Sequence, residues 1–552
     1  MSPGILRLID RIEVPPSRMA LSLLALAFLL PGMTGHDPWK TLDVVSVDIA
    51  YRMQQSGDWL VPRLAGEVWF EDTPVYHWLA LFCGKALGWL IEFHDAARLA
   101  SGICMLLAAG ALFYTAKTWS AAEQRTQASA AAALLLLGSV GLFIHAHEAM
   151  PELATLAALS LAFAALCKAP AQGQKMSVPL RALGLGAGLA VSFFSGGWAA
   201  PAAILAAAVA TLVSSSQWRN PGGLLALFAG CALGVGLAAL WPLALWHRDP
   251  NLLALWMRHQ GVMHDPPLEN ARYFLVTSLW FLWPAWPLAL WALWSKSSQW
   301  REPSMLVPLA ALLVGLPVLA VTGRIQDVKL VVILAPVVLL GAQGAPKLLR
   351  GAAAALDWFG VMLFAFFTGV IWVAYVAMLT GYPPRIARNF LRVTPGFLQP
   401  LEPFALVFAV LLALTWFYVV FRSARGPTRS LLRWMAGATL LWGTFAMLWM
   451  PWVDHQRSYR SVAMQLRSHI PAGTSCIYGR NLGNAQRAAF DYHAGIVTRR
   501  FDKTRPRACV FLLVQGEPRH EGPPPGKDWV RITELGRPGD KAERYRLYRL
   551  AR

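Results

Sequence analysis

Charged residues are scarce in this chain. Asp, Glu, Lys and Arg together make up 14% of the 552 residues, whereas soluble domains carry about a quarter. Hydrophobic residues make up 56%, and many continuous runs approach the roughly 20 apolar residues that a helix needs to cross a bilayer. The composition therefore excludes a soluble globular protein and predicts an α-helical polytopic membrane protein.

Motifs that would define several other functions are also missing. The sequence has no glycine-rich phosphate-binding motif, so a soluble nucleotide substrate is not indicated. It has no basic motif interleaved with aromatic residues, so nucleic acid is not an expected partner. The net charge of +19 comes from Lys and Arg that cluster between the apolar runs and in the tail. This pattern orients membrane helices and attracts anionic lipid, so membrane lipids are expected partners.

The apolar runs predict about thirteen spans. Lys and Arg fall in every second gap between them, which places the N-terminus in the cytoplasm and the tail outside. The first run lacks a cleavage site and is expected to be retained as a helix. The predicted spans are residues 19–35, 97–117, 127–145, 152–168, 181–196, 198–214, 222–245, 273–294, 304–321, 329–345, 352–379, 403–421 and 434–452.

The tail, 453–552, is predicted to be a small α/β domain that follows a transmembrane domain of residues 1–452. Short helical and strand-like stretches alternate there with turns rich in Pro and Gly. The tail has 19 Lys and Arg against 9 Asp and Glu, and this net charge of +10 should draw it onto an anionic leaflet. Helices are expected at 458–469 and 486–490, and strands at 476–478, 508–514, 529–534 and 545–550.

Six cysteines divide between the two predicted domains. Four lie in hydrophobic runs, where cysteine packs as a small apolar residue. Cys476 and Cys509 lie in strand-like segments of the tail. They would form a disulfide in an oxidising compartment, and two unpaired buried thiols fit the sequence equally well.

The first outward loop, 36–96, is the most polar part of the first half of the chain. It reads Leu42-Asp43, then Gly57-Asp58-Trp59-Leu60-Val61-Pro62-Arg63, then Phe70-Glu71-Asp72-Thr73-Pro74 and Tyr76-His77-Trp78. Acids beside a bilayer are costly unless they do chemistry or hold a fold. The loop is therefore predicted to contain the functional site, and its stretches 43–55 and 76–91 to be helices lying at the membrane interface.

With the multispanning body and the small outward tail, this loop resembles the GT-C glycosyltransferases. It is most similar to the bacterial protein O-mannosyltransferase-like group that includes the lipid A aminoarabinose transferases. That group tends to read Asp-Glu, Gly-Asp-Trp-hydrophobic-hydrophobic-Pro and Phe-Glu-Lys-Pro-Pro in this loop. Here Leu42-Asp43 replaces Asp-Glu, and Asp72 stands where the group has Lys. The stretches 145–152 and 324–329 resemble later outward loops of the group.

The resemblance implies an integral-membrane glycosyltransferase of the bacterial inner membrane. It would move a sugar from a polyprenyl-phosphate donor to a periplasmic acceptor, which could be lipid A, a glycan or a protein, by an inverting mechanism. The reaction needs a carboxylate near the acceptor nucleophile. It also needs cations or backbone N–H groups that stabilise the departing phosphate.

Acids of the first two outward loops are the candidates for this carboxylate. Asp43 is the first choice, because it occupies the second position of the family's acidic pair. Glu152 and Glu148 follow. The ordinary alternatives are an acid at a helix N-terminus for Asp43 and a helix cap for the two glutamates. The other candidates in the first loop, for substrate binding, are Asp48, Glu71, Asp72 and Tyr76.

Outward-facing basic residues are the candidates for binding the donor phosphate. Arg324 and Lys329 rank first, because they precede a long apolar run along which a lipid chain could lie. Arg63 follows the matched Trp-Leu-Val-Pro motif, and Arg258 and His259 lie in a later outward loop. Each could instead anchor the protein to lipid headgroups.

No cofactor is expected. A divalent metal held by His145 and His147 with Glu148 and Asp43 is a weaker alternative, because the His-x-His spacing is not a tight ligand motif on a helix. Two other functions stay open: a transporter or flippase of lipid-linked glycan, and a non-catalytic homologue whose tail binds a partner. A transporter would favour repeated halves with charged or broken spans. No such repeat is evident, and the acids lie in loops, which favours the enzyme.

Overall fold

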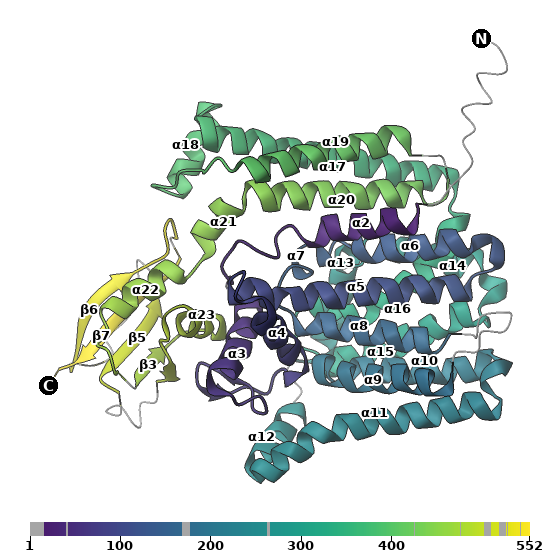
Figure 1. Ribbon diagram of the computed structural model, residues 1–552, viewed down its shortest axis with the longest axis horizontal. Helices are drawn as coiled ribbons and strands as arrows, with labels where there is room; N and C mark the ends of the chain where they lie inside the picture. Colours follow the sequence, from purple (N-terminus) through teal and green to yellow (C-terminus); the bar gives the residue numbers. More distant parts are fainter. Residues whose placement is uncertain are drawn as a thin grey trace.

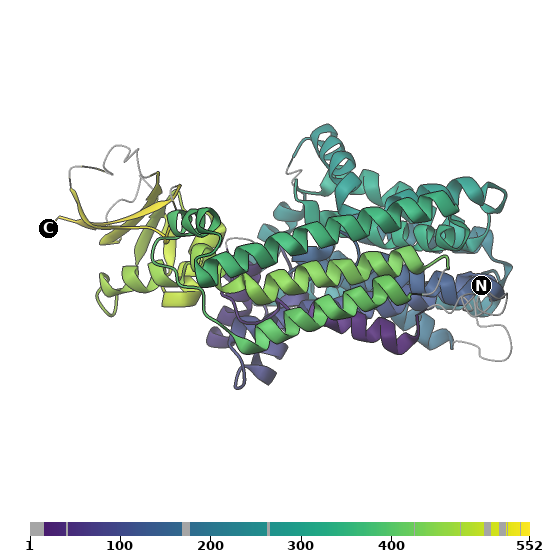
Figure 2. The ribbon, with the colours of Figure 1, turned by 90° about the horizontal axis from the view of Figure 1, so that it is seen from above.

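The protein consists of a bundle of long helices with a small sheet-containing domain at one end (Figure 1). Figure 2 shows the same end-to-end arrangement from above. The computed structural model describes residues 16–39, 42–167, 177–261, 265–423, 426–474, 476–501, 509–517, 526, 528–540 and 542–551. The predicted fold class, an α-helical polytopic protein with a small C-terminal α/β domain, is confirmed.

Every predicted span falls on a helix of the described chain. Among the described residues, eight helices are long and apolar enough to cross a membrane, and the pair α13 (Pro267–Phe281) and α14 (Ala285–Ser295) adds a ninth. This is fewer than the thirteen spans predicted, because the helices at the other four predicted spans have only 12 to 16 residues. The pair α13 and α14 is bent by 96°, so the span expected at 273–294 is broken. The helices at the other twelve predicted spans are α2 (Arg18–Leu29), α5 (Phe93–Trp119), α6 (Arg125–Leu137), α8 (Pro151–Ala165), α9 (Val178–Gly196), α10 (Ala199–Ser214), α11 (Pro221–Arg248), α15 (Pro303–Thr322), α16 (Val331–Gly344), α17 (Arg350–Thr380), α19 (Pro403–Arg422) and α20 (Arg429–Leu448).

Small residues let the helices of the bundle approach closely, as is usual between membrane helices. A Cβ atom on Gly186 of α9 would lie 2.9 Å from the carbonyl oxygen of Gly230 in α11. One on Gly188 would lie 3.0 Å from that of Ala158 in α8. In the middle of this packing, every residue of α16 is buried. The bundle is thus a tightly packed frame for the loops at its ends.

Several elements outside the spans lie at the end of the bundle that faces the tail (Figure 1). The two helices predicted in the first loop are confirmed as α3 and α4, with a two-stranded hairpin between them. Residues 43–50 of α3 are all buried, so this helix lies inside the protein rather than on a lipid surface. The elements are α3 (Leu42–Ser56), β1 (Arg63–Leu64), β2 (Glu67–Val68), α4 (Pro74–Leu87), α7 (Leu142–His145), α12 (Pro250–Gly261), η4 (Asp327–Leu330) and α18 (Pro384–Val393).

The tail is built on a five-stranded sheet with the strand order β4-β3-β5-β7-β6. β3 pairs in parallel with β4 and β5, and β7 is antiparallel to β5 and β6. The predicted helices and strands fall on α22, α23, β3, β5, β6 and β7. The elements are α21 (Met450–Arg457), α22 (Arg460–Ser468), β3 (Ile477–Arg480), α23 (Asn484–Ala494), β4 (Thr498–Arg500), β5 (Phe511–Gly516), β6 (Trp529–Leu535) and β7 (Arg544–Leu550).

Sequence reasoning missed the edge strand β4. It has three residues, and its two arginines, Arg499 and Arg500, are exposed, so it lacks the apolar alternation that marks a strand. Cys476 and Cys509 are joined by a disulfide that connects the start of β3 to the start of β5. This settles the alternative that the sequence left open for these two cysteines. The division between the two domains at 452/453 stays a prediction, and α21 crosses it.

Arg98 of α5 holds the first loop to the bundle. It is fully buried, and its guanidinium binds both carboxylate oxygens of Asp43, at 3.2 and 2.8 Å. Its other N–H groups donate to Asp95 and to the backbone carbonyls of His36 and Asp37. All five donors of the arginine are therefore used. Asp43 in turn accepts the backbone N–H of Ala149 at 2.7 Å, which ties the second outward loop to the same point.

Asp37, next to this arginine, connects the first loop to the tail. Its side chain accepts hydrogen bonds from Ser458, at 2.6 Å, and from Arg460, at 2.8 Å. Its backbone N–H donates to Asp454. On the far side of the loop, Arg52 of α3 forms an ion pair with Asp491 of α23. The tail is therefore docked directly on the loop that the sequence predicts to be functional.

We expect Asp43→Asn to destabilise the protein strongly. The amide would leave the buried Arg98 charge uncompensated, and breaking a buried ion pair costs about 3–5 kcal/mol. Asp48→Asn is a matched control on the same helix, because Asp48 is equally buried. The control should not lower stability at pH 7. Thermal unfolding of the full-length protein in detergent compares the two variants, and equal losses would contradict the assigned role of the Asp43–Arg98 pair.

Asp48 should also give the protein a pH-dependent stability. Burial raises its pKa to about 7, although Arg52 and a backbone hydrogen bond from Ala65 oppose the shift. Because the folded-state pKa lies above the unfolded value, the folded protein binds more protons between these values, and stability is lost as the pH rises from about 4 to 7. The loss is at most about 1.4 kcal/mol per pH unit. Relative to Asp48→Asn, the wild-type protein should become less stable on going from pH 5 to pH 8.

Candidate functional site

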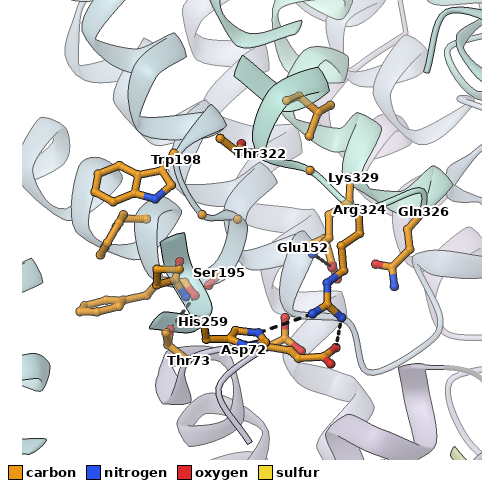
Figure 3. A pocket seen from close by; sticks show the side chains of 18 of the residues that line it. Asp72, Thr73, Glu152, Ser195, Trp198, His259, Thr322, Arg324, Gln326 and Lys329 are labelled. Atoms are coloured by element: carbon orange, nitrogen blue, oxygen red, sulfur yellow. Dashed lines mark hydrogen bonds and ion pairs between the residues drawn. The ribbon is translucent and has the colours of Figure 1, made fainter. Parts of the chain in front are cut away.

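A cavity of about 220 Å³ lies where several loops meet at the end of the bundle that faces the tail. It is formed by the loop before α4, the first turn of α8, the end of α9, the end of α12 and the segment between α15 and α16 (Figure 3). Six of the twelve site residues predicted from the sequence line it. They are Glu71, Asp72, Glu152, His259, Arg324 and Lys329.

Two ion pairs form across this cavity. Lys329 Nζ lies 2.6 Å from Glu152 Oε1, and Glu152 is almost completely buried. Arg324 Nη1 lies 2.5 Å from Glu71 Oε2. Figure 3 shows Lys329 beside Glu152 and Arg324 reaching toward His259. Both cations come from one short segment between α15 and α16, so the packing of these two helices sets their positions.

Two buried polar atoms of the cavity have no hydrogen-bond partner within the described chain: Glu152 Oε2 and Ser195 Oγ. Native proteins rarely leave buried polar atoms unpaired, because their desolvation is then uncompensated. Both residues line the cavity. A ligand with hydroxyl groups or donor hydrogens would satisfy them. Glu152 is thus held at one oxygen by Lys329, and its other oxygen has no partner within the described chain.

Asp72 adds a third acid. Burial raises its pKa to about 6; the nearby Lys329 opposes this shift, whereas Glu152 and Glu71 add to it. The indole N–H of Trp69 donates to this carboxylate at 3.5 Å. Part of the Asp72 population is therefore protonated near neutral pH and can donate a hydrogen bond, where a lysine would carry a full positive charge.

His259, at the end of α12, completes the mouth of the cavity. Its Nε2 lies 3.5 Å from Arg324 Nη2. Burial, together with the charge of Arg324, lowers its pKa, so the imidazole is neutral at pH 7. Its neighbour Arg258 is exposed and does not line this cavity. The two residues, paired in the sequence prediction, therefore face different surroundings.

Asp43, the first choice for the base, lies outside the cavity, although the adjacent Leu42 lines it. The Asp43 carboxylate is fully buried, and its oxygens bind Arg98 and the N–H of Ala149. Burial acts to raise the pKa of Asp43, but the Arg98 charge outweighs it and keeps the pKa below the ordinary value. A base with this pKa and these contacts is poorly placed to accept a proton. Its catalytic role stays a prediction, and the geometry favours Glu152.

The remaining predicted residues lie at four other places. Asp48 is buried in α3, with Oδ1 unpaired and Oδ2 accepting from Ala65. Arg63 lines a separate cavity beside the hairpin. Tyr76 forms a buried hydrogen bond of 2.7 Å with Ser101. Glu148 lies 3.2 Å from His145, in a third cavity between α7 and α20.

One argument for Arg324 and Lys329 was wrong in its physical basis. The apolar run that follows them was expected to offer a surface for a lipid chain, but this run is α16, which is entirely buried. An apolar cavity of about 350 Å³ exists instead between α4, α9 and α11. It shares Phe194 with the candidate site. A continuous apolar run therefore did not distinguish a buried helix from a lipid-facing one.

Sequence reasoning missed Thr73, Trp198, Gln260 and Gln326, which also line the cavity. Thr73 carried a usable signal, because Thr before Pro is typical of a helix start. Its hydroxyl donates to the carbonyl of Phe194 at 2.5 Å and joins the first loop to the end of α9. Within the described residues, no group of three or more His, Cys, Asp or Glu side chains has the geometry of a metal site.

Known proteins share both sequence and fold with this chain. No protein-family profile matches. The undecaprenyl phosphate-alpha-4-amino-4-deoxy-L-arabinose arabinosyl transferase 2 of Sodalis glossinidius is 27% identical over 214 residues, which is 38% of this chain and 36% of that protein. The sequence match therefore spans only about a third of the relative.

The structural match covers nearly the whole chain. The crystal structure of ArnT from Cupriavidus metallidurans bound to undecaprenyl phosphate has a TM-score of 0.66 and 16% identity, over 99% of this chain and 98% of that one. The apo structure of the same protein gives 0.62 over the same shares. The chain thus has the ArnT fold, and the resemblance to the GT-C glycosyltransferases is confirmed at the level of the fold.

Proposed function

We propose that this protein is a membrane glycosyltransferase that moves a sugar from a polyprenyl-phosphate donor to lipid A. The observation that carries the proposal is the cavity in which Arg324, Lys329 and the half-paired Glu152 meet at one end of the bundle. The ArnT fold and the partial match to an arabinosyl transferase support it. The sugar, the polyprenyl length and the precise acceptor atom stay open.

The donor would bind with its phosphate at the two cations. Lys329 and Arg324 are each paired with a carboxylate, so the phosphate would replace or share Glu152 and Glu71 as their partner. Charge-assisted hydrogen bonds to a phosphate strengthen as the leaving group gains charge. The apolar cavity that shares Phe194 with the site is the proposed place for the first isoprene units.

Glu152 would act on the acceptor. Its free Oε2 would take the proton of an acceptor hydroxyl, or orient an acceptor that is already ionised. The bond between the sugar C1 and the phosphate oxygen breaks, and the polyprenyl phosphate leaves with the electron pair. A new bond forms between C1 and the acceptor oxygen on the opposite face, which inverts the configuration. Asp43 would position Glu152 through its hydrogen bond with Ala149, since Ala149 and Glu152 belong to the same loop.

The proposed location is the bacterial inner membrane, with the N-terminus in the cytoplasm and the tail in the periplasm. The alternation of Lys and Arg between the spans supports this orientation. The site and the tail lie at the same end of the bundle (Figure 1), so both would face the periplasm. Lipid A and a flipped polyprenyl-phosphate sugar would be accessible there.

The proposal is tested by mass spectrometry of lipid A, surface glycans and polyprenyl phosphates from cells with and without the protein. A sugar mass that appears on lipid A only when the protein is present would support it. Sugar gained by a glycan or a protein instead would assign a different acceptor. Polyprenyl-phosphate sugars that change sides of the membrane without any transfer would replace the enzyme by a transporter.

We expect Glu152→Gln to lower kcat at least about 100-fold, because general-base groups contribute at least this much. The donor KM should change little, since the two cations remain. Lys329→Met should lower kcat and also raise the donor KM, because the phosphate loses one of its two cations. Glu269→Gln, a change at an exposed acid at the start of α13, is the control. A Glu152→Gln protein as active as this control would remove Glu152 from the mechanism.

A further inference from the structure

A second cavity adjoins the candidate site on the side of the tail. It has a volume of about 160 Å³ and shares Glu71 and His259 with the site. Its remaining lining comes from the hairpin segment of the first loop, from α12, and from three tail residues, Asn484, Arg487 and Arg500. The tail thus supplies side chains to a space that shares two lining residues with the proposed reaction site.

Two tail arginines converge on one loop carboxylate in this cavity. Arg487 Nη1 lies 2.9 Å from Glu67 Oε2, and Arg500 Nε lies 3.5 Å from the same oxygen. Arg487 is buried, and its other donors bind the hydroxyl and the carbonyl of Thr498. It is therefore fixed as part of the tail's own structure. Within the described residues, Arg500 has only the longer contact, and 74% of its side chain is exposed.

The strand β4 explains why Arg500 faces the cavity. β4 is the edge strand of the tail sheet. Successive residues of a strand point to opposite faces, so Arg500 shares a face with the buried Thr498, and Arg499 points the other way. Gly66, at the turn of the hairpin, has a positive φ of +80°, and a Cβ there would lie 3.0 Å from the Val497 side chain. This contact brings the hairpin against the start of β4.

At this cavity three arginines, Arg324, Arg487 and Arg500, meet two carboxylates, those of Glu67 and Glu71, so the charges favour an anion. Glu71 is bound to Arg324, and Glu67 is bound to Arg487. The positive charge of Arg500 is the least compensated of the charges that line it, and the tail as a whole has a net charge of +10. A guanidinium beside an amide and an imidazole matches the oxygens of a phosphate, because arginine offers planar paired donors.

We propose that Arg500, with Asn484 and His259, binds an anionic group of the acceptor and thereby sets acceptor specificity from the tail. The inference rests on the proposed function, because only a transferase has an acceptor. The group belongs to the acceptor rather than to the donor, because the donor phosphate is placed at Arg324 and Lys329 in the reaction site, whereas this cavity lies beyond that site, between the first loop and the tail. A phosphate on a lipid or glycan headgroup has the required chemistry.

Binding of inorganic phosphate to the full-length protein in neutral detergent tests the site without any assumption about catalysis. The titration is done in a Lys329→Met background, which weakens phosphate binding at the reaction site. Arg500→Gln should weaken the remaining binding roughly tenfold, the effect of one lost charge-assisted hydrogen bond. Arg499→Gln removes the same charge on the opposite face and should change it less than about twofold. Equal effects of the two variants would overturn the proposal.

Vesicles distinguish a built site from general attraction to a surface. Phosphatidylcholine vesicles with and without phosphatidic acid are mixed with detergent-purified protein, and the fraction of protein that partitions onto the vesicles is measured. Anionic lipid attracts any exposed arginine, so a loss of partition that is the same in both variants, without a specific loss of phosphate binding, would identify only a membrane-facing surface and contradict the assigned site.

Transfer kinetics separate the two proposals. With an active enzyme, Arg500→Gln should raise KM for a phosphorylated acceptor roughly tenfold and leave kcat and the KM for its dephosphorylated form unchanged. Arg499→Gln should leave all of these constants unchanged. If no transfer occurs but phosphate binding still depends on Arg500, the proposed function fails and the anion site stands. If transfer occurs and Arg500→Gln behaves as Arg499→Gln, the site fails and the function stands.

Discussion

The buried ion pair between Asp43 and Arg98 is the contact on which the rest of the outward surface depends. The arginine belongs to the rigid bundle, and it binds the first loop through Asp43 and through the carbonyls of residues 36 and 37. Asp43 passes the connection to Ala149. Two loops that are far apart in the sequence therefore acquire fixed positions from one charged pair. Such a pair is tolerated inside a protein only when all of its hydrogen bonds are made, and here they are.

The candidate site inherits its geometry from that arrangement. The loop that contains Ala149 leads into α8, whose first turn places Glu152 in the cavity. Lys329 lies in the segment before α16 and binds Glu152 there. Three acids and two cations share this small space, so the site is rich in charge but close to neutral as a whole. Because each cation is already paired, a substrate phosphate would exchange partners rather than bring a bare charge to a bare charge.

The tail helps to hold the first loop in position. Asp37 and Arg52 of the loop region are bound by tail residues, and the hairpin that precedes Glu71 rests on β4 and α23. Its excess of positive charge was readable in the sequence and suggested attraction to a membrane. The structure adds that some of this charge points at the first loop instead. Asp72, an acid where the family that the sequence resembles has lysine, lies near the charges of Lys329, Glu152 and Glu71.

The sequence by itself determined the class of the protein. Long apolar runs predict spans, and strand-like alternation predicts the tail sheet, because both patterns report how far the local segment is removed from water. It also identified Glu71, Asp72, Glu152, Arg324 and Lys329 as polar residues in costly places. Only the tertiary structure decided which of these meet. Glu152 and Lys329 are 177 residues apart, and Arg98 was not among the residues that the sequence singled out. Periodicity says which face of a helix is buried but not what it is buried against, since that depends on how the helices pack.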